Sequence, residues 1–218
     1  MLRLGATFKK TGRAKYISHL DLNRCMLRIF RRSKLPVWYT EGFNPHPYYS
    51  FALALSLGFE SDCEIMDFNI TDDNMPLSVI KDRLNEVMPE GMGIVDIAPQ
   101  KNKITVIAKA EYEFDLKADD VQGVYDAVEK LLAADEILIE KKTKKGIKTV
   151  DLKPDTEMVS LEKAEGAVHM TMRLPAGTKT NYNPTLFVEA LRKSCEIPFE
   201  MANIRRTEIL CKNNEKFS

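Results

Sequence analysis

The spacing of hydrophobic residues predicts alternating strands and helices along the first part of the chain. A period of two predicts strands at residues 2–9, 48–57, 62–70 and 93–98. Hydrophobic residues three and four positions apart predict helices at residues 18–34 and 77–88. A short β-rich piece at residues 37–40 stands outside this series. Without it, the order is β-α-β-β-α-β, which is that of a ferredoxin-like unit.

The second part of the chain repeats this order more loosely. Strands are predicted at residues 104–116, 136–142, 166–174 and 202–211, and helices at residues 118–133 and 184–194. Residues 156–162 are a candidate for a further strand. Two copies of one order predict an α+β protein of two tandem ferredoxin-like (βαββαβ) units with antiparallel sheets, at residues 1–100 and 101–218. The halves share little residue identity, so this prediction depends on element order.

The predicted helix at residues 18–34 separates apolar and basic residues onto opposite faces. Ser18 is a candidate N-cap, and Asp21 in the first turn suits the helix dipole. One face carries Leu22, Cys25, Met26, Ile29 and Phe30. The opposite face carries Arg24, Arg28, Arg31 and Arg32. Because a planar guanidinium donates two parallel hydrogen bonds, this basic face suits phosphate groups.

Charge is concentrated in the same region. Residues 1–47 contain ten Lys or Arg against two acids, a net charge of +8. The whole chain has 32 of each sign, so the remainder has 22 against 30, or −8. Arg13 and Lys15 precede the helix and add to the basic character. This polarity predicts an anionic partner, and the alternative is an ordinary solvated basic face.

The segment Glu41 to Pro47, EGFNPHP, predicts a rigid loop. Pro45 and Pro47 restrict the backbone, including that of the residues before them. A pre-ordered loop that presents Phe43, Asn44 and His46 resembles a platform for base stacking and hydrogen bonding. The alternative is a structural turn whose aromatic residues fill the core.

Two other stretches add basic residues to the candidate binding surface. The Lys-rich segment at residues 141–148, which includes Lys144 and Lys145, predicts a basic hairpin tip or a mobile loop. The segment at residues 173–184 places Lys179 ahead of a helix N-terminus, where anions bind. It lacks the GxxxxGK[ST] spacing of a phosphate-binding P-loop, so a plain polar loop is the alternative.

Composition limits the class of protein. The chain is 44% hydrophobic and 29% charged, as is typical of a soluble globular protein, and no apolar run approaches the ~20 residues of a membrane span. The N-terminus lacks the apolar core of a signal peptide. Four scattered cysteines without a CxxC pair predict reduced thiols, a cytoplasmic location, no metal site and no cofactor.

The segments SHLD (residues 18–21), RRSKLP (31–36) and EGFNPHP (41–47) closely resemble a bacterial family of uncharacterised radical-SAM-linked proteins. The resemblance is specific in the first 70 residues. It implies a radical-SAM partner and a translation or RNA context, with no known reaction. The chain has no CxxxCxxC, so it cannot hold the radical-SAM cluster itself. A similarity of architecture alone links it to CRISPR repeat-processing endoribonucleases, which pair two ferredoxin-like units and bind RNA.

Three functions follow from these features. The first is an RNA-binding module, non-catalytic on its own, that presents RNA to a radical-SAM partner. The second is a protein-interaction subunit of a radical-SAM enzyme, which does not bind RNA directly. The third is a metal-independent ribonuclease or transferase with His19 and His46 as its acid–base pair. The alternative for His19 is a hydrogen-bonded packing residue.

Overall fold

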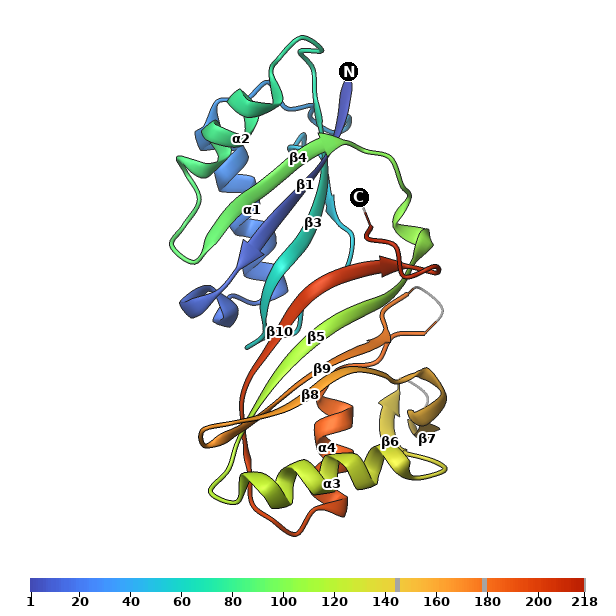
Figure 1. The fold of residues 1–218 in the computed structure, drawn as a ribbon. Helices are drawn as coiled ribbons and strands as arrows, with labels where there is room; N and C mark the ends of the chain where they lie inside the picture. Colours follow the sequence, from blue (N-terminus) through green and yellow to red (C-terminus); the bar gives the residue numbers. More distant parts are fainter. Residues whose placement is uncertain (144–145, 178–179, 218) are drawn as a thin grey trace. The chain divides into compact units, whose positions relative to one another are not determined.

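The computed structural model describes residues 1–143, 146–177 and 180–217, and the chain divides into two compact units. Unit 1 comprises Met1–Val106 with Lys216–Ser218, and unit 2 comprises Ile107–Glu215 (Figure 1). Both units combine helices with an antiparallel sheet, so the protein is of the mixed α+β class. None of the helices in the described ranges is long and apolar enough to cross a membrane.

Unit 1 contains a sheet of four strands in the order β4-β1-β3-β2. Its elements are β1 (Leu2–Lys10), a 3₁₀ helix η1 (Gly12–Tyr16), α1 (His19–Ser33), β2 (Tyr49–Phe51), β3 (Glu60–Ile70), α2 (Leu77–Asn85), β4 (Met92–Pro99) and a 3₁₀ helix η2 (Ile104–Val106). The strand predicted at residues 48–57 is much shorter. After Phe51 the Ala52 N–H donates to the carbonyl of Ile65, and the Gly58 N–H donates to the carbonyl of Lys15.

The core of unit 1 lies between this sheet and the two helices, which cover one face of it (Figure 1). Alternate residues of β1 point into the core, among them Leu4 and Phe8, which are fully buried. Phe68 of β3 lies opposite Leu4 and packs against Phe30 of α1, with ring centroids 5.3 Å apart. The residues between these positions therefore face away from the helices.

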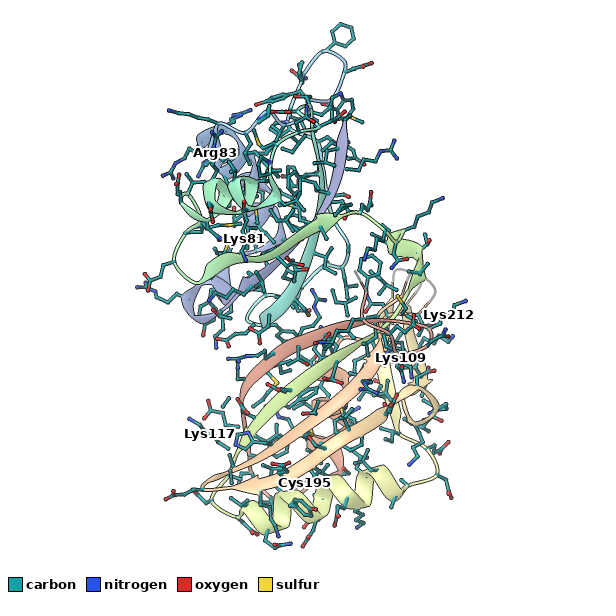
Figure 2. All side chains as sticks on the ribbon, turned by 45° about the horizontal axis from the view of Figure 1, so that its top comes forward. Lys81, Arg83, Lys109, Lys117, Cys195 and Lys212 are labelled. Carbon is teal, nitrogen blue, oxygen red and sulfur yellow. The ribbon has the colours of Figure 1, made fainter. Side chains whose placement is uncertain are left out.

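Helix α1 has well-defined ends. The Ser18 hydroxyl accepts a hydrogen bond from the Asp21 N–H at 3.1 Å and donates to the Asp21 carboxylate at 2.7 Å, so the predicted N-cap is confirmed. At the other end Lys34 adopts a left-handed conformation with φ of 54°. Arg83 of α2 donates to the Lys34 carbonyl at 3.4 Å, which satisfies one of the free carbonyls there (Figure 2).

Unit 2 contains a four-stranded sheet in the order β10-β5-β9-β8. Its elements are β5 (Ile107–Lys117), α3 (Val121–Ala133), β6 (Leu138–Thr143), β7 (Gly146–Asp151), a 3₁₀ helix η3 (Lys153–Asp155), β8 (Glu157–Ala164), β9 (Ala167–Pro175), α4 (Thr185–Ser194) and β10 (Glu200–Cys211). Val128 of α3, Phe187 of α4 and Phe114 of β5 are all fully buried.

The second strand of this sheet is not the expected one. The segment predicted at residues 136–142 forms β6, which pairs with β7 in a separate two-stranded sheet. The candidate strand at residues 156–162 forms β8 and pairs with β9. Gly166, with φ of 70°, allows a tight turn between β8 and β9, so these neighbours in sequence pair directly.

Candidate nucleic-acid interface

The predicted division of α1 into two faces matches its burial. Leu22, Met26, Ile29 and Phe30 are buried, whereas all four arginines of the helix are exposed. One arginine is already paired, because Arg24 Nη1 lies 3.2 Å from Asp21 Oδ1. Both side chains of this pair are more than half exposed, so solvent screens the interaction.

The other three arginines, Arg28, Arg31 and Arg32, present unneutralised charge. Within the described ranges, no hydrogen bond or ion pair engages their guanidinium groups. Arg28 and Arg32 both lie close enough to the half-buried Cys25 thiol to oppose the rise in its pKa that burial causes. The exposed face of α1 therefore offers three cations to an external anion.

Arg13 and Lys15 extend the basic surface beyond the start of α1. Both belong to η1, where Arg13 is exposed and Lys15 is half-buried. The Lys15 ammonium lies 5.5 Å from the centre of the exposed Tyr16 ring. Since Arg31 and Arg32 lie in the last turn of the 15-residue helix, the basic groups are spread over roughly 20 Å.

The EGFNPHP loop is closed by hydrogen bonds between Thr40 and His46. The Thr40 N–H donates to the His46 carbonyl at 2.9 Å, and the His46 N–H donates to the Thr40 hydroxyl at 3.2 Å. His46 Nδ1 lies 3.1 Å from that hydroxyl and 3.0 Å from the Asn44 carbonyl. The His46 side chain therefore orders the loop.

Phe43 stands at the tip of this loop with its ring completely exposed, at 105% of the reference area. Asn44 beside it is also exposed. The ring makes no contribution to the core, so the alternative of a core-filling turn is wrong for Phe43. A free aromatic face of this kind is available for stacking.

The end of the loop returns to α1. The Tyr49 hydroxyl donates to the Asn23 carbonyl of α1 at 2.8 Å, and the rings of Tyr49 and Phe30 are 5.6 Å apart. Phe51 packs against His19, with ring centroids 5.6 Å apart in an edge-on arrangement. His19 and His46 thus have separate partners and share no hydrogen bond.

The two basic loops of unit 2 meet at their described ends. Lys141 of β6 donates to the Asn181 carbonyl at 2.7 Å, and its ammonium lies 5.2 Å from the centre of the Tyr182 ring. Lys144, Lys145 and Lys179 lie outside the described residues. The sequence pattern gave no sign that these two loops meet, and the contact between Lys141 and Asn181 joins them.

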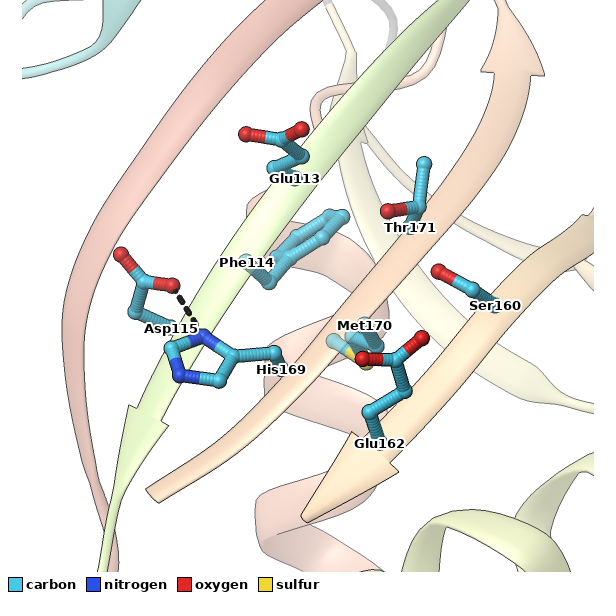
Figure 3. A pocket seen from close by; sticks show the side chains of 8 residues that line it. All are labelled: Glu113, Phe114, Asp115, Ser160, Glu162, His169, Met170 and Thr171. Atoms are coloured by element: carbon cyan, nitrogen blue, oxygen red, sulfur yellow. Dashed lines mark hydrogen bonds and ion pairs between the residues drawn. The ribbon is translucent and has the colours of Figure 1, made fainter. Parts of the chain in front are cut away.

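Sequence reasoning missed two cavities. In unit 2, a cavity of about 330 Å³ lies over β5, β8 and β9, and His169 Nδ1 is 2.6 Å from Asp115 Oδ1 at its edge (Figure 3). Glu113 and Glu162 also line it, so its charge is unsuited to a polyanion. In the described part of the chain, no three His, Cys, Asp or Glu residues are placed to hold a metal ion.

In unit 1, a cavity of about 340 Å³ opens on the sheet face away from the helices. Its lining includes Arg3, Trp38, Tyr48, Asp67, Asn69 and Gln100. The signal in the sequence was the pair of polar residues at alternate positions in the apolar strand β3. Their partners come from distant parts of the chain, which the sequence pattern did not bring together.

Comparison with known proteins gives a family and a fold. No curated protein matches the chain significantly. One solved structure, described as "Crystal Structure of a Cbf5-Nop10-Gar1 Complex", matches with a TM-score of 0.51 and 11% identity, over 94% of this chain and 48% of that one. The chain thus spans about half the length of that protein, and the likeness concerns the fold alone. Residues 3–184 match a family model, and the chain belongs to the family described as "Uncharacterized protein conserved in bacteria (DUF2344)".

Proposed function

We propose that both units are ferredoxin-like. The strands of unit 1 follow the order β4-β1-β3-β2 in the sheet, and those of unit 2 follow β10-β5-β9-β8. If β5, β8, β9 and β10 are numbered as the four strands of a unit, the two orders are the same. The β6–β7 hairpin is then an insertion between the first helix and second strand of unit 2.

We further propose that the protein is an RNA-binding accessory module that presents RNA to a radical-SAM partner. The observation that carries RNA binding is the exposed face of α1, where Arg28, Arg31 and Arg32 have no hydrogen-bond or ion-pair partner in the described ranges. Arginine forks fit phosphate oxygens, and binding them would release counterions from the RNA.

The loop that follows α1 supplies the second element of this surface. Phe43 is fully exposed, and the hydrogen bonds of His46 hold the loop that carries it. Tyr49 ties the end of the loop back to α1. An ordered aromatic tip on a loop that is tied to a basic helix combines base stacking with phosphate binding, as single-stranded RNA requires.

The radical-SAM partner and a cytoplasmic location belong to the proposal through the resemblance of the SHLD and EGFNPHP segments. The chain lacks a CxxxCxxC segment, so the cluster and the chemistry would come from the partner. The module's part in the reaction is to bind and orient RNA.

Titration of fluorescent tRNA and ribosomal RNA fragments with the full chain tests RNA binding. Affinity should fall as salt rises. Arg28→Glu with Arg32→Glu should weaken binding about tenfold or more at low salt, because two phosphate contacts are lost and two repulsions are added.

A matched control is Lys117→Glu with Lys212→Glu, which makes the same change in net charge on exposed residues of unit 2 (Figure 2). The control should bind almost as well as the native chain. Equal losses in both double variants would contradict a binding site on α1, and an absence of binding at low salt would contradict the RNA-binding function.

A second candidate is a protein-interaction subunit, which the full exposure of Phe43 favours, since aromatic residues anchor protein interfaces. Purified radical-SAM protein from the same bacterium would be tested for co-elution with the chain. Stable co-elution that Phe43→Ala abolishes, without any RNA binding, would select this function.

A further inference from the structure

The cavity in unit 1 lies on the sheet face that the helices leave uncovered. In β1 and β3, Leu4 and Phe68 face the core, so the residues next to them face the other way. On that face Arg3 lies directly opposite Asn69, and Gly5 lies opposite Asp67. The Asp67 carboxylate lies over Gly5, where a Cβ atom would be 3.5 Å from Asp67 Oδ1.

Two aromatic residues form one wall of the cavity. The Trp38 N–H donates to the Asn69 carbonyl at 2.9 Å, and the Tyr48 N–H donates to the Trp38 carbonyl at 2.9 Å. These bonds place residues 38 and 48 beside the last residues of β3 and fix both backbone segments relative to Asn69. The rings are 5.5 Å apart and nearly perpendicular, so a flat ligand can stack on one and meet the edge of the other.

The floor of the cavity is polar and poorly exposed to solvent. Asp67 and Asn69 are each only 8% exposed. Gln100 donates to Asp67 Oδ2 at 2.6 Å, whereas no residue in the described ranges forms a hydrogen bond with the Asn69 side-chain amide. In the described ranges, every fully buried side-chain N or O atom has a hydrogen-bond partner. The unpaired Asn69 amide is therefore not fully buried, and Asn69 lines the cavity. An unpaired amide in such a place points to a ligand.

We propose that this cavity holds one unstacked base of the bound RNA, and that guanine is the base it fits best. The inference rests on the proposed RNA-binding function. Guanine presents two adjacent N–H groups, which match the two oxygens of the Asp67 carboxylate. The Asn69 amide can donate to the guanine carbonyl, and the Trp38 and Tyr48 rings supply stacking. The volume of about 340 Å³ lies in the range of small-molecule sites.

Trp38 is the only tryptophan of the chain, so its fluorescence reports directly on this cavity. The full chain would be titrated with GMP, AMP, CMP and UMP. GMP should change the emission in a saturable way and bind about tenfold or more tightly than UMP, which offers a single N–H donor on its base. Equal responses to all four nucleotides, or none at millimolar concentration, would overturn the proposal.

Asp67→Asn tests the role of the carboxylate without removing the side chain. It should weaken GMP binding about tenfold or more, because an amide nitrogen faces a donor. It should also improve the binding of xanthosine monophosphate, whose base carries a carbonyl where guanine has its amino group. The second effect is a gain, so it cannot arise from misfolding.

Asp96→Asn is the matched control, because Asp96 is an exposed acid of β4 that does not line this cavity. It should leave GMP binding unchanged. An equal loss of GMP binding in the two variants would contradict the guanine site. So would an Asp67→Asn variant that binds xanthosine monophosphate no better than the native chain does. RNA binding that depends on Arg28 and Arg32 would still stand in that case, so the two proposals fail separately.

Discussion

Asp67 and Glu157 are strand carboxylates whose pKa values move in opposite directions. Burial raises the pKa of Asp67, and the hydrogen bond from Gln100 opposes this only in part. The hydrogen bond from Lys109 lowers the pKa of Glu157, and Arg173 adds to the effect. Lys109 Nζ and Arg173 Nη1 both lie 2.9 Å from oxygens of this carboxylate. The two residues should therefore affect stability with opposite dependence on pH.

Replacement of Asp67 by Asn should stabilise the protein at neutral pH. The pKa of Asp67 in the folded protein lies above the unfolded value of about 3.8. The contribution of the native carboxyl to stability is therefore fully present only below that value, and it is lost as pH rises through the folded pKa. The excess of the variant's unfolding free energy over that of the native chain should grow from pH 4 and then level off. Urea unfolding between pH 4 and 8 measures it, and a gain that shrinks with rising pH would contradict the burial argument.

Glu157→Gln should show the reverse behaviour. Its folded pKa lies below the usual value of 4.5, so its contribution to stability is present above that value and is lost as pH falls through the folded pKa. The variant should lose less than about 1 kcal/mol at neutral pH, because the side chain is 39% exposed. Glu162→Gln is the control, because Glu162 is exposed and forms no ion pair with any residue that the structure describes. A loss that persists at low pH would show that charge is not its cause.

At the scale of elements, the N-cap residue Ser18 fixes the start of α1, the helix that carries the basic face. Ser18→Ala removes the hydroxyl that accepts from the Asp21 N–H, and should cost about 1 kcal/mol of unfolding free energy. Ser18→Thr should retain most of the stability, since its hydroxyl can both accept from the Asp21 N–H and donate to the Asp21 carboxylate. Chemical denaturation of the two variants measures both effects. Equal stability of Ser18→Ala and the native chain would mean that tertiary packing alone fixes this end.

The types of most elements could be predicted, because hydrophobic periodicity follows directly from which face is buried. The partner of β9 could not. Residues 136–142 and 156–162 have comparable strand patterns, and periodicity does not say which pairs with β9. The choice depends on the short β8–β9 turn at Gly166 and on the pairing of β6 with β7, which are matters of chain connection.

At the scale of the whole molecule, the polarity of charge could be read from the sequence, whereas the cavity could not. The arginines of α1 are neighbours in sequence, so helix geometry alone places them together. Arg3, Trp38, Asp67 and Gln100 meet only after β1 has paired with both β3 and β4, and after the segment at Trp38 has bonded to Asn69 of β3. Patterns of exposed residues that are neighbours in sequence could therefore be predicted, and sites assembled from distant segments could not.

The net charge of the chain is zero, so salt-dependent RNA binding would have to come from a local concentration of basic residues. The salt dependence of binding therefore tests the polarity of charge. If Arg28, Arg31 and Arg32 each contact one phosphate of single-stranded RNA, their joint replacement by Gln should reduce the slope of log affinity against log salt by about 2. Arg24→Gln should change the slope less, because Asp21 already neutralises Arg24 in the free protein. Titrations at several salt concentrations measure both slopes. If Arg24→Gln lowered the slope as much as the loss of any one of the other three, the ion pair with Asp21 would have to open on binding, and the whole face of α1 would contact RNA.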